Sequence, residues 1–195
     1  MTTDNLKSYC KRFVSLTDEE LKLIDEYFEP KAVRKNEFLL EAGKVCDFIA
    51  FIDNGILRHF HIKDGIEKTC DISFKDTFIT DFSSFSSGLL SEYYFQALQD
   101  TETFIIRRNS LAKLYAECPK YESLGRQMAE LVAERATQIA RSLSSEKPEE
   151  RYERLIKEHP GLLLQVQQKY IANFLGISPE SLSRIRNRIV NRGKS

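Results

Sequence analysis

The sequence predicts an α+β protein with an N-terminal antiparallel β jelly-roll barrel, a long dimerisation helix and a C-terminal helix-turn-helix domain. Turn signals recur about every ten residues between residues 31 and 108, which is typical of an all-β unit. A helical apolar period then runs over residues 121–144, and two short helical patterns joined at a glycine follow. The predicted domains are 1–120 for the N-terminal helix and barrel, 121–144 for the long helix and 145–195 for the helix-turn-helix.

Size and hydropathy favour a soluble protein with one large or two small cores. The chain has 195 residues, of which 42% are hydrophobic. Its longest apolar run is the five residues Phe48–Ile52, whereas a membrane-spanning helix needs about 20. The first residues lack the basic and apolar blocks of an export signal. We therefore expect a cytoplasmic protein that has no membrane partner.

The four cysteines are widely separated along the chain. No Cys-x-x-Cys pair occurs among Cys10, Cys46, Cys70 and Cys118. In a reducing compartment they are most simply small core residues, so we expect neither a zinc site nor an iron–sulfur cluster. A Gly-rich phosphate loop is also missing from the sequence. The sequence thus indicates no cofactor.

The formal net charge of +0 conceals an uneven distribution along the chain. From Pro160 to Ser195 the balance is +5, with a single acidic residue, Glu180, and the rest of the chain carries −5. A basic end is often a solvated, disordered tail. Here a helical apolar pattern within the basic region favours a folded, cationic domain.

The N-terminal part of the chain predicts a helix over Asp18–Phe28. Thr17 is suited to be its N-cap, and Glu20 lies three residues later, where it completes a capping box. Pro30 ends this helix. We expect the helix to precede the barrel.

The barrel region changes to short runs rich in Phe, Ile and Thr. The dipeptides Asn54-Gly55 and Asp64-Gly65 between apolar alternations are strong hairpin signals. They indicate roughly eight antiparallel strands. No helix-length periodic segment is expected between Lys31 and Arg108.

After the barrel the sequence predicts a short helix, Ser110–Cys118, and a long one, Tyr121–Ser144. The long helix carries one apolar stripe and is longer than the barrel needs, so we favour a parallel dimer helix, with packing on its own domain as the alternative. A break and a new helix start follow at Pro148. The predicted dimer-interface residues are Leu124, Met128, Leu131, Val132, Ile139 and Leu143.

The last segment combines two helices with a tight turn. Gly176 can adopt the left-handed conformation that such a turn requires, Ser178 is an N-cap and Pro179 a first-turn residue. Two helices joined this way form a helix-turn-helix, although a helical hairpin with a solvated surface is the plainer alternative. On the second helix Leu182, Ile185 and Ile189 are expected to face inward, and Glu180, Arg184 and Arg188 outward.

The chemistry of the second helix favours DNA over the plainer alternative. Arginine outnumbers lysine four to none from Arg184 to Arg192. A guanidinium can bind guanine O6 and N7 in a bidentate manner or contact phosphate, as a helix in the major groove requires. We therefore expect sequence-specific binding to double-stranded DNA.

The order of these elements resembles the Crp/Fnr family of bacterial transcription regulators. The resemblance is most specific over Ile171–Arg184, read as Ile-Ala-x-x-Leu-Gly-Ile-Ser-Pro-Glu-Ser-Leu-Ser-Arg, and weaker over Gly43–Phe60. It implies a cyclic-nucleotide-binding-like barrel, a winged helix-turn-helix, a homodimer and no enzymatic activity. It also suggests RNA polymerase and a small-molecule effector as further partners.

The resemblance places individual residues on the DNA. Glu180 and Arg184 fall on the family's base-reading glutamate and arginine, while Pro179 replaces another reading arginine and has no donor. The operator is therefore expected to be near-palindromic and to differ at one base pair. The C-terminal strands of the family have no counterpart before the sequence ends. The predicted DNA-contacting residues are Gln167, Gln168, Lys169, Ser178, Glu180, Ser181, Arg184, Arg186 and Arg188.

The barrel departs from the cyclic-nucleotide-binding members of the family. Tyr93-Tyr94 stands where their phosphate-binding Arg-Ser pair belongs, and no basic residue occurs between Lys75 and Arg107. A buried cyclic phosphate would lack compensation, so we expect no binding of cyclic AMP in the usual way. Asp81, Tyr93 and Tyr94 are the expected pocket residues for an unknown effector, with simple packing as an equal alternative.

A small metalloenzyme of the cupin type is the competing interpretation. His59 and His61 fall on one face of a predicted strand, and Glu67 follows, which resembles the His-x-His…Glu metal motif. Such a site needs a further histidine, and the next one, His159, lies outside the barrel. We therefore expect a binding protein and not an enzyme.

Overall fold

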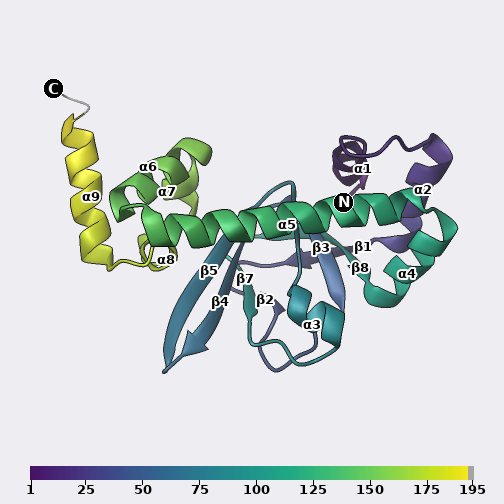
Figure 1. Ribbon diagram of the computed structural model, residues 1–195, viewed down its shortest axis with the longest axis horizontal. Helices are drawn as coiled ribbons and strands as arrows, with labels where there is room; N and C mark the ends of the chain where they lie inside the picture. Colours follow the sequence, from purple (N-terminus) through teal and green to yellow (C-terminus); the bar gives the residue numbers. More distant parts are fainter. Residues whose placement is uncertain (193–195) are drawn as a thin grey trace.

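The computed structural model describes residues 1–192, so the last residues of the predicted C-terminal domain, 193–195, lie outside the described part. Two N-terminal helices, a β-region, a long helix and a helical head follow one another along the chain (Figure 1). None of the helices in residues 1–192 is long and apolar enough to span a membrane. The helices are α1 (Asp4–Cys10), α2 (Asp18–Tyr27), α3 (Phe82–Ser87), α4 (Arg108–Glu117), α5 (Lys120–Ser145), α6 (Pro148–Glu158), α7 (Leu162–Gln165), α8 (Gln168–Phe174) and α9 (Pro179–Arg192).

The β-region consists of two open four-stranded antiparallel sheets. Sheet A has the order β1-β8-β3-β6, and sheet B has the order β2-β7-β4-β5. The described residues thus contain eight strands, in agreement with the roughly eight expected, and these form two open sheets. The strands are β1 (Glu29–Val33), β2 (Phe38–Leu40), β3 (Phe48–Asn54), β4 (Ile56–Lys63), β5 (Ile66–Phe74), β6 (Thr77–Ile79), β7 (Tyr94–Ala97) and β8 (Thr101–Arg107).

The inner faces of the two sheets form one apolar core. Because side chains alternate along a strand, Ala50 and Ile52 of β3 and Leu57 of β4 face inward and are buried. Their neighbour Phe51 faces outward from sheet A and belongs to a different cluster. The hairpin signal at Asp64-Gly65 is confirmed as the turn between the paired strands β4 and β5. The hairpin expected at Asn54-Gly55 is wrong, because these residues connect β3 of sheet A to β4 of sheet B, and the two strands do not pair.

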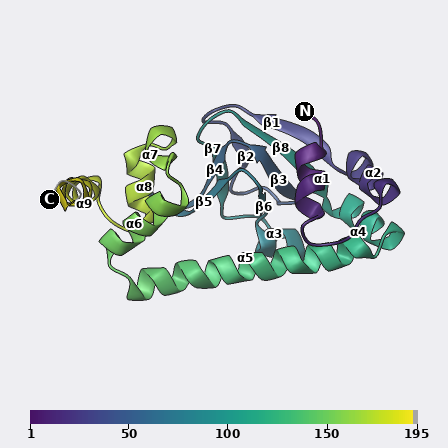
Figure 2. The same cartoon turned by 90° about the horizontal axis from the view of Figure 1, so that it is seen from above.

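The outer face of sheet A is covered by the N-terminal helices together with α4 and the start of α5 (Figure 2). Helix α2 has the predicted capping box: the Thr17 hydroxyl accepts from the Glu20 N–H at 3.2 Å, and the Glu20 carboxylate accepts from the Thr17 N–H at 2.7 Å. Helix α1 was not predicted. It belongs to the same cluster, with Leu6 and Cys10 fully buried against the body.

Helix α3 is a second unpredicted element, inside the region expected to hold no helix-length segment. Its serine-rich sequence lacks an apolar period, and its ends are fixed locally. The Asp81 carboxylate accepts from the Ser84 N–H at its start, and Gly88, with φ +76°, ends it. Asp81 is thus a helix cap.

The outer face of sheet B carries the helical head formed by α6–α9. Ile56 and Ile72 of the sheet join Tyr152 and Leu155 of α6 and Ile171 of α8 in a single buried cluster. Figure 2 shows these helices gathered at the β4–β5 end of the molecule. The head and the sheet therefore share one core.

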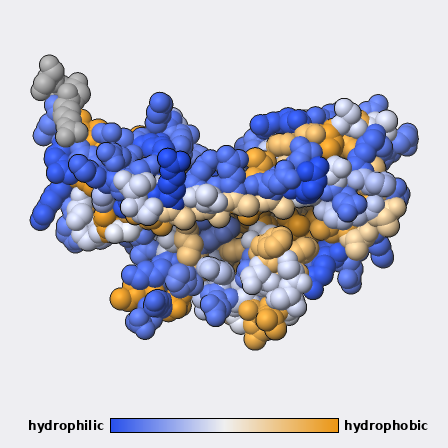
Figure 3. Space-filling model, in the orientation of Figure 1, coloured by the Kyte–Doolittle hydropathy of each residue, from blue (hydrophilic) through white to orange (hydrophobic). Residues whose placement is uncertain are grey.

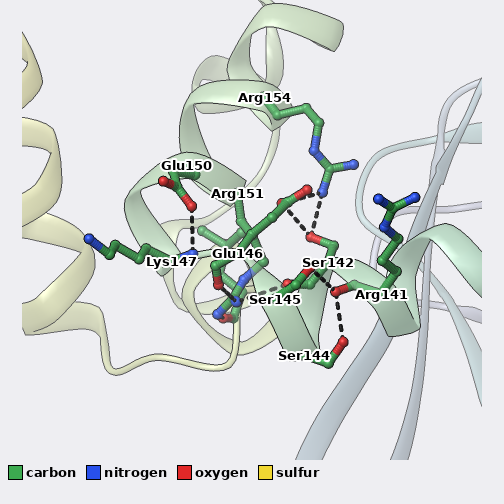
Figure 4. A network of polar contacts seen from close by, with 10 residues as sticks. Arg141, Ser142, Ser144, Ser145, Glu146, Lys147, Glu150, Arg151 and Arg154 are labelled. Carbon is green, nitrogen blue, oxygen red and sulfur yellow. Dashed lines mark hydrogen bonds and ion pairs between the residues drawn. The ribbon is translucent and has the colours of Figure 1, made fainter.

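Helix α5 ends at Ser145 and α6 begins at Pro148, where the sequence predicts a helix break. The bend between them is held by a polar network that includes Ser142, Glu146, Arg151 and Arg154 (Figure 4). The Ser142 hydroxyl donates to the Glu146 carboxylate at 2.6 Å, and that carboxylate accepts from Arg154 at 3.0 Å. The bend is consequently a fixed elbow, not an open linker.

Candidate nucleic-acid interface

Helices α8 and α9 follow one another across a short turn, as the sequence predicts. Gly176 lies between them with φ +70°, and the next residue, Ile177, donates its N–H to the Ala172 carbonyl at 3.0 Å. The Ser178 hydroxyl then accepts from the Ser181 N–H at 3.2 Å and caps α9. Leu182 and Ile185 are buried, as the spacing predicts.

The exposed side of α9 begins with Glu180 and Arg184, one turn apart. The pKa of Glu180 is lowered, first by its own backbone N–H at the helix start, then by the Ser178 hydroxyl and the charge of Arg184. A carboxylate acceptor and a guanidinium donor therefore stand side by side on an exposed helix start. These two groups match the acceptor and donor chemistry of base edges in a major groove.

The helix α8 contributes a second exposed group of predicted contacts. Gln167, Gln168 and Lys169 at its start are all exposed. The Lys169 ammonium lies 4.7 Å from the centre of the Tyr170 ring. Ser178 is exposed and Ser181 half-buried at the start of α9, so the structure brings these residues to the two helix starts flanking the turn.

Two predicted DNA contacts also have partners within the head. Arg188 forms an ion pair with Glu149 of α6 at 2.9 Å, and Arg186 is half-buried and hydrogen-bonded to Tyr152. The sequence argument considered acidic residues within α9 alone, and Glu149 comes from another helix. Arg188 and Arg186 thus connect α9 to α6.

A cavity of about 840 Å³ lies between the inner face of sheet B and α5. His59, Asp71 and Ser73 line it from the sheet, and Arg135 lines it from α5. The Arg135 guanidinium donates to the Asp71 carboxylate at 2.8 Å. Burial lowers the pKa of His59, so its ring is neutral at pH 7.

The predicted pocket residues do not line this cavity. Tyr94 points to the outer face of sheet B, where it stacks on Phe60 at 4.9 Å, because its neighbour Phe95 takes the inward position. Tyr93 is exposed with its ring edge-on to His61, and Asp81 caps α3. Arg135, which the prediction missed, supplies a cation from a helix distant in sequence.

The two histidines of the metal hypothesis do share one face of β4, as predicted, and both line the cavity. His59 stacks on Phe95 at 4.3 Å and its Nε2 lies 3.4 Å from the Ser73 hydroxyl. The His61 Nδ1 lies 3.2 Å from the Cys70 thiol. Over residues 1–192 no cluster of three or more His, Cys, Asp or Glu side chains is arranged to hold a metal ion.

The predicted dimer stripe of α5 divides into a buried and an exposed part. Leu124 is buried in the chain's own core beside Tyr121, so its assignment to a dimer interface is wrong. Further along, Leu131, Val132 and Leu143 are 42%, 44% and 52% exposed. Figure 3 shows a continuous apolar band on this face of α5. The other two predicted positions, Met128 and Ile139, are half-buried.

Solved structures share this architecture. FixK2 from Bradyrhizobium japonicum is 18% identical with a TM-score of 0.71 over 85% of this chain and 86% of its own. A CooA variant from Carboxydothermus hydrogenoformans is 15% identical with a TM-score of 0.71, over 99% and 87%. A Crp/Fnr-family regulator, described as putative, from Eubacterium rectale is 19% identical with a TM-score of 0.67, over 95% and 89%.

The chain has the Crp/Fnr fold. No protein-family model matches its sequence, and no curated protein does. Within the Crp/Fnr fold of this chain, sequence reasoning missed the groups that join separate elements, such as Arg135 on α5 and Asn173 on α8. Their partners lie far away in sequence. The one signal for such groups would have been a polar residue on the face of an amphipathic helix that is expected to pack inward.

Proposed function

We propose that this chain is a sequence-specific DNA-binding transcription regulator. The observation that carries the proposal is the exposed Glu180 and Arg184 pair at the start of α9, directly after a helix-turn-helix turn. The Crp/Fnr fold supports it, since a solved structure from Eubacterium rectale described as a putative transcriptional regulator has the same architecture. Glu180 accepts from a cytosine N4 amine and Arg184 donates to guanine, with about 1–3 kcal/mol of discrimination for each good contact.

The regulator acts as a parallel dimer through α5. Three exposed apolar side chains, Leu131, Val132 and Leu143, lie on one helix with exposed alanines between them. Small residues allow a second helix to approach closely, and burial of the stripe supplies the driving force. The dimer presents two recognition helices to successive major grooves, about 34 Å apart.

The cavity between sheet B and α5 holds the effector in this proposal, and the effector is not cyclic AMP bound in the usual way. The side chains of Tyr93 and Tyr94 lie outside the cavity, and the Arg135 guanidinium is already paired with Asp71. A cyclic phosphate would have to displace this ion pair. Isothermal titration with cyclic AMP is expected to show no tight one-to-one binding, and tight binding would overturn this part of the proposal.

Selection of bound sites from random double-stranded DNA tests the main proposal. We expect a near-palindromic consensus, and recovery of unrelated sequences would contradict it. On the consensus site, Arg184→Ala should relax the preference at one base pair of each half-site. Arg34→Ala removes an exposed charge from the β-region and is the matched control, which should leave that preference unchanged. Equal weakening on all sequences would instead make Arg184 a phosphate contact.

The dimer is tested independently by sedimentation equilibrium. Val132→Glu and Leu131→Glu place a charge on the exposed stripe and should shift the chain toward a monomer. The control Thr137→Glu changes another exposed residue of the same helix that was not assigned to the stripe. A wild-type chain that stays monomeric at high concentration would exclude the proposed interface.

A further inference from the structure

Helix α8 is hydrogen-bonded to the free edge of sheet B through the side chain of Asn173. Strand β5 is the outermost strand of that sheet, so backbone groups along its outer edge have no strand partner. The Asn173 Oδ1 accepts from the Thr69 N–H, and the Asn173 Nδ2 donates to the Glu67 carbonyl at 3.0 Å. One amide thus satisfies a donor and an acceptor two residues apart, as a neighbouring strand would.

A second contact lies beside this amide on the outer face of sheet B. Arg58 is 1% exposed, and its guanidinium lies between two rings, 3.9 Å from the centre of Phe60 and 4.0 Å from that of Tyr170. It also donates to the Glu67 carboxylate at 2.7 Å and to the side-chain amide oxygen Oε1 of Gln96 at 2.9 Å. Tyr170, on α8, therefore closes the side of this site that faces the head.

Two effects of opposite sign act on these contacts. Separation would expose the apolar side chains of Ile56 and Ile72, which favours attachment. It would also return the buried Arg58 guanidinium to water, which favours release because burial of a charge is costly. The two effects oppose each other, so the attachment can orient the head without fixing it permanently to the sheet.

The attachment leaves the DNA-facing groups free. Gln168 and Lys169 of α8 and Glu180 and Arg184 of α9 are all exposed while α8 is held on the sheet. In Figure 1, α9 stands at the end of the molecule, away from both sheets. The attached head is therefore in a position to read DNA, and attachment fixes the direction in which it reads.

We propose that Asn173 and Tyr170 are positioning residues for DNA binding, which orient the recognition helix by attaching α8 to the edge of sheet B. This inference rests on the proposed function. Orientation matters when two heads must reach two half-sites at once, because a loosely held second head has a lower effective concentration at its half-site. A single half-site needs no such alignment.

The experiment compares two DNA duplexes, the selected palindrome and one half-site, for each variant. Asn173→Asp is nearly isosteric but replaces the amide donor by an acceptor that repels the Glu67 carbonyl. We expect about a tenfold loss of affinity for the palindrome and little change for the half-site. Tyr170→Ala should behave in the same way, whereas Tyr170→Phe keeps the ring over Arg58 and should bind as the wild type does. Leu164→Ala, at a position 94% exposed in the same head, is the matched control.

Hydrogen exchange of the Thr69 amide tests the attachment without DNA. Its exchange should be slow in the wild type and faster in Asn173→Ala, which removes the acceptor oxygen, while the Ala50 amide in the central strand β3 stays protected in both. A wild-type chain that binds no DNA sequence selectively would refute the proposed function. Sequence-selective binding by the wild type, together with equal palindrome affinity for Asn173→Asp, would refute the positioning role alone. Equal losses on both duplexes would show damage to the helix-turn-helix and also contradict it.

Discussion

The Tyr115 ring occupies the space in which a side chain at Gly125 would begin. A Cβ atom at this position would lie 2.9 Å from the Tyr115 Cζ and closer still to its hydroxyl. Tyr115 comes from α4 and Gly125 from α5, so the absence of a side chain lets the two helices pack closely.

Gly125→Ala should therefore destabilise the protein, although alanine is the better helix former by about 1 kcal/mol. The Tyr115 ring must move out of a half-buried site, and overpacking of this kind costs about 1–3 kcal/mol. Urea unfolding measures the change. In a Tyr115→Leu background the same glycine change should be neutral or stabilising, and an equal cost in both backgrounds would show that the ring is not the cause.

Gly55→Ala should have a larger effect, at the connection between β3 of sheet A and β4 of sheet B. Gly55 has φ +114°, and a Cβ atom there would lie 2.7 Å from the Thr101 Cα, which is backbone and cannot turn away. We expect a loss of about 3 kcal/mol in the free energy of unfolding. Gly65→Ala is the control, since Gly65 has φ +74° but open space around it, and it should lose clearly less.

Acidification should weaken the fold through two histidines. Burial is the main cause that lowers the pKa of both His59 and His159 below the ordinary value of 6.5. Each ring then binds its proton less readily in the folded than in the unfolded chain. Their contribution to stability is therefore complete above pH 6.5 and decreases as the pH falls from 6.5 through the folded-state pKa values.

The measurement is the urea midpoint at pH 7.5 and at pH 5.5. His159 stacks on Phe74 with 3.8 Å between ring centres, and Glu158, Arg135 and Asp71 are the charged groups that act on it. Replacement of His159 by Gln should lower stability at pH 7.5 and reduce the difference between the two midpoints. If the variant keeps the full difference, His159 does not contribute to the acid sensitivity.

Cys70 should be the most reactive of the four thiols. Burial raises the pKa of both Cys10, to about 12, and Cys70, so access decides between the thiols, and Cys10, Cys46 and Cys118 are all buried. Cys70 is half-buried at a β-bulge, which departs from the expectation that all four cysteines are core residues. A thiol reagent should modify about one cysteine per native chain, and Cys70→Ser should abolish this phase. Rapid modification of two or more thiols in the folded protein would contradict the burial pattern.

Local chemistry made much of the fold predictable. The capping box of Thr17 and Glu20, the helix start at Pro148 and the turn at Gly176 all depend on residues a few positions apart. The exposed position of Glu180 and Arg184 follows from helical spacing in the same way. Features of this kind need no knowledge of the rest of the chain.

What depends on distant partners could not be predicted from the sequence. Leu124 belongs to the periodic stripe of α5, but contacts with the N-terminal helices decide that it is core. Arg188 has the spacing of an exposed reading residue, yet Glu149 on another helix pairs with it. Tyr94 was placed by resemblance alone, and the alternation of its strand turns it away from the cavity.

The Arg151 side chain couples the elbow between α5 and α6 to helix α8. Its guanidinium donates to the carbonyls of Glu146 at 2.7 Å and of Leu175 at 2.7 Å, so one side chain grips the end of α5 and the end of α8 together. The elbow should therefore transmit motion from α5 to the helical head. A rotation of α5 about its own axis should therefore move α8 as well, because the Arg151 side chain holds the ends of the two helices together.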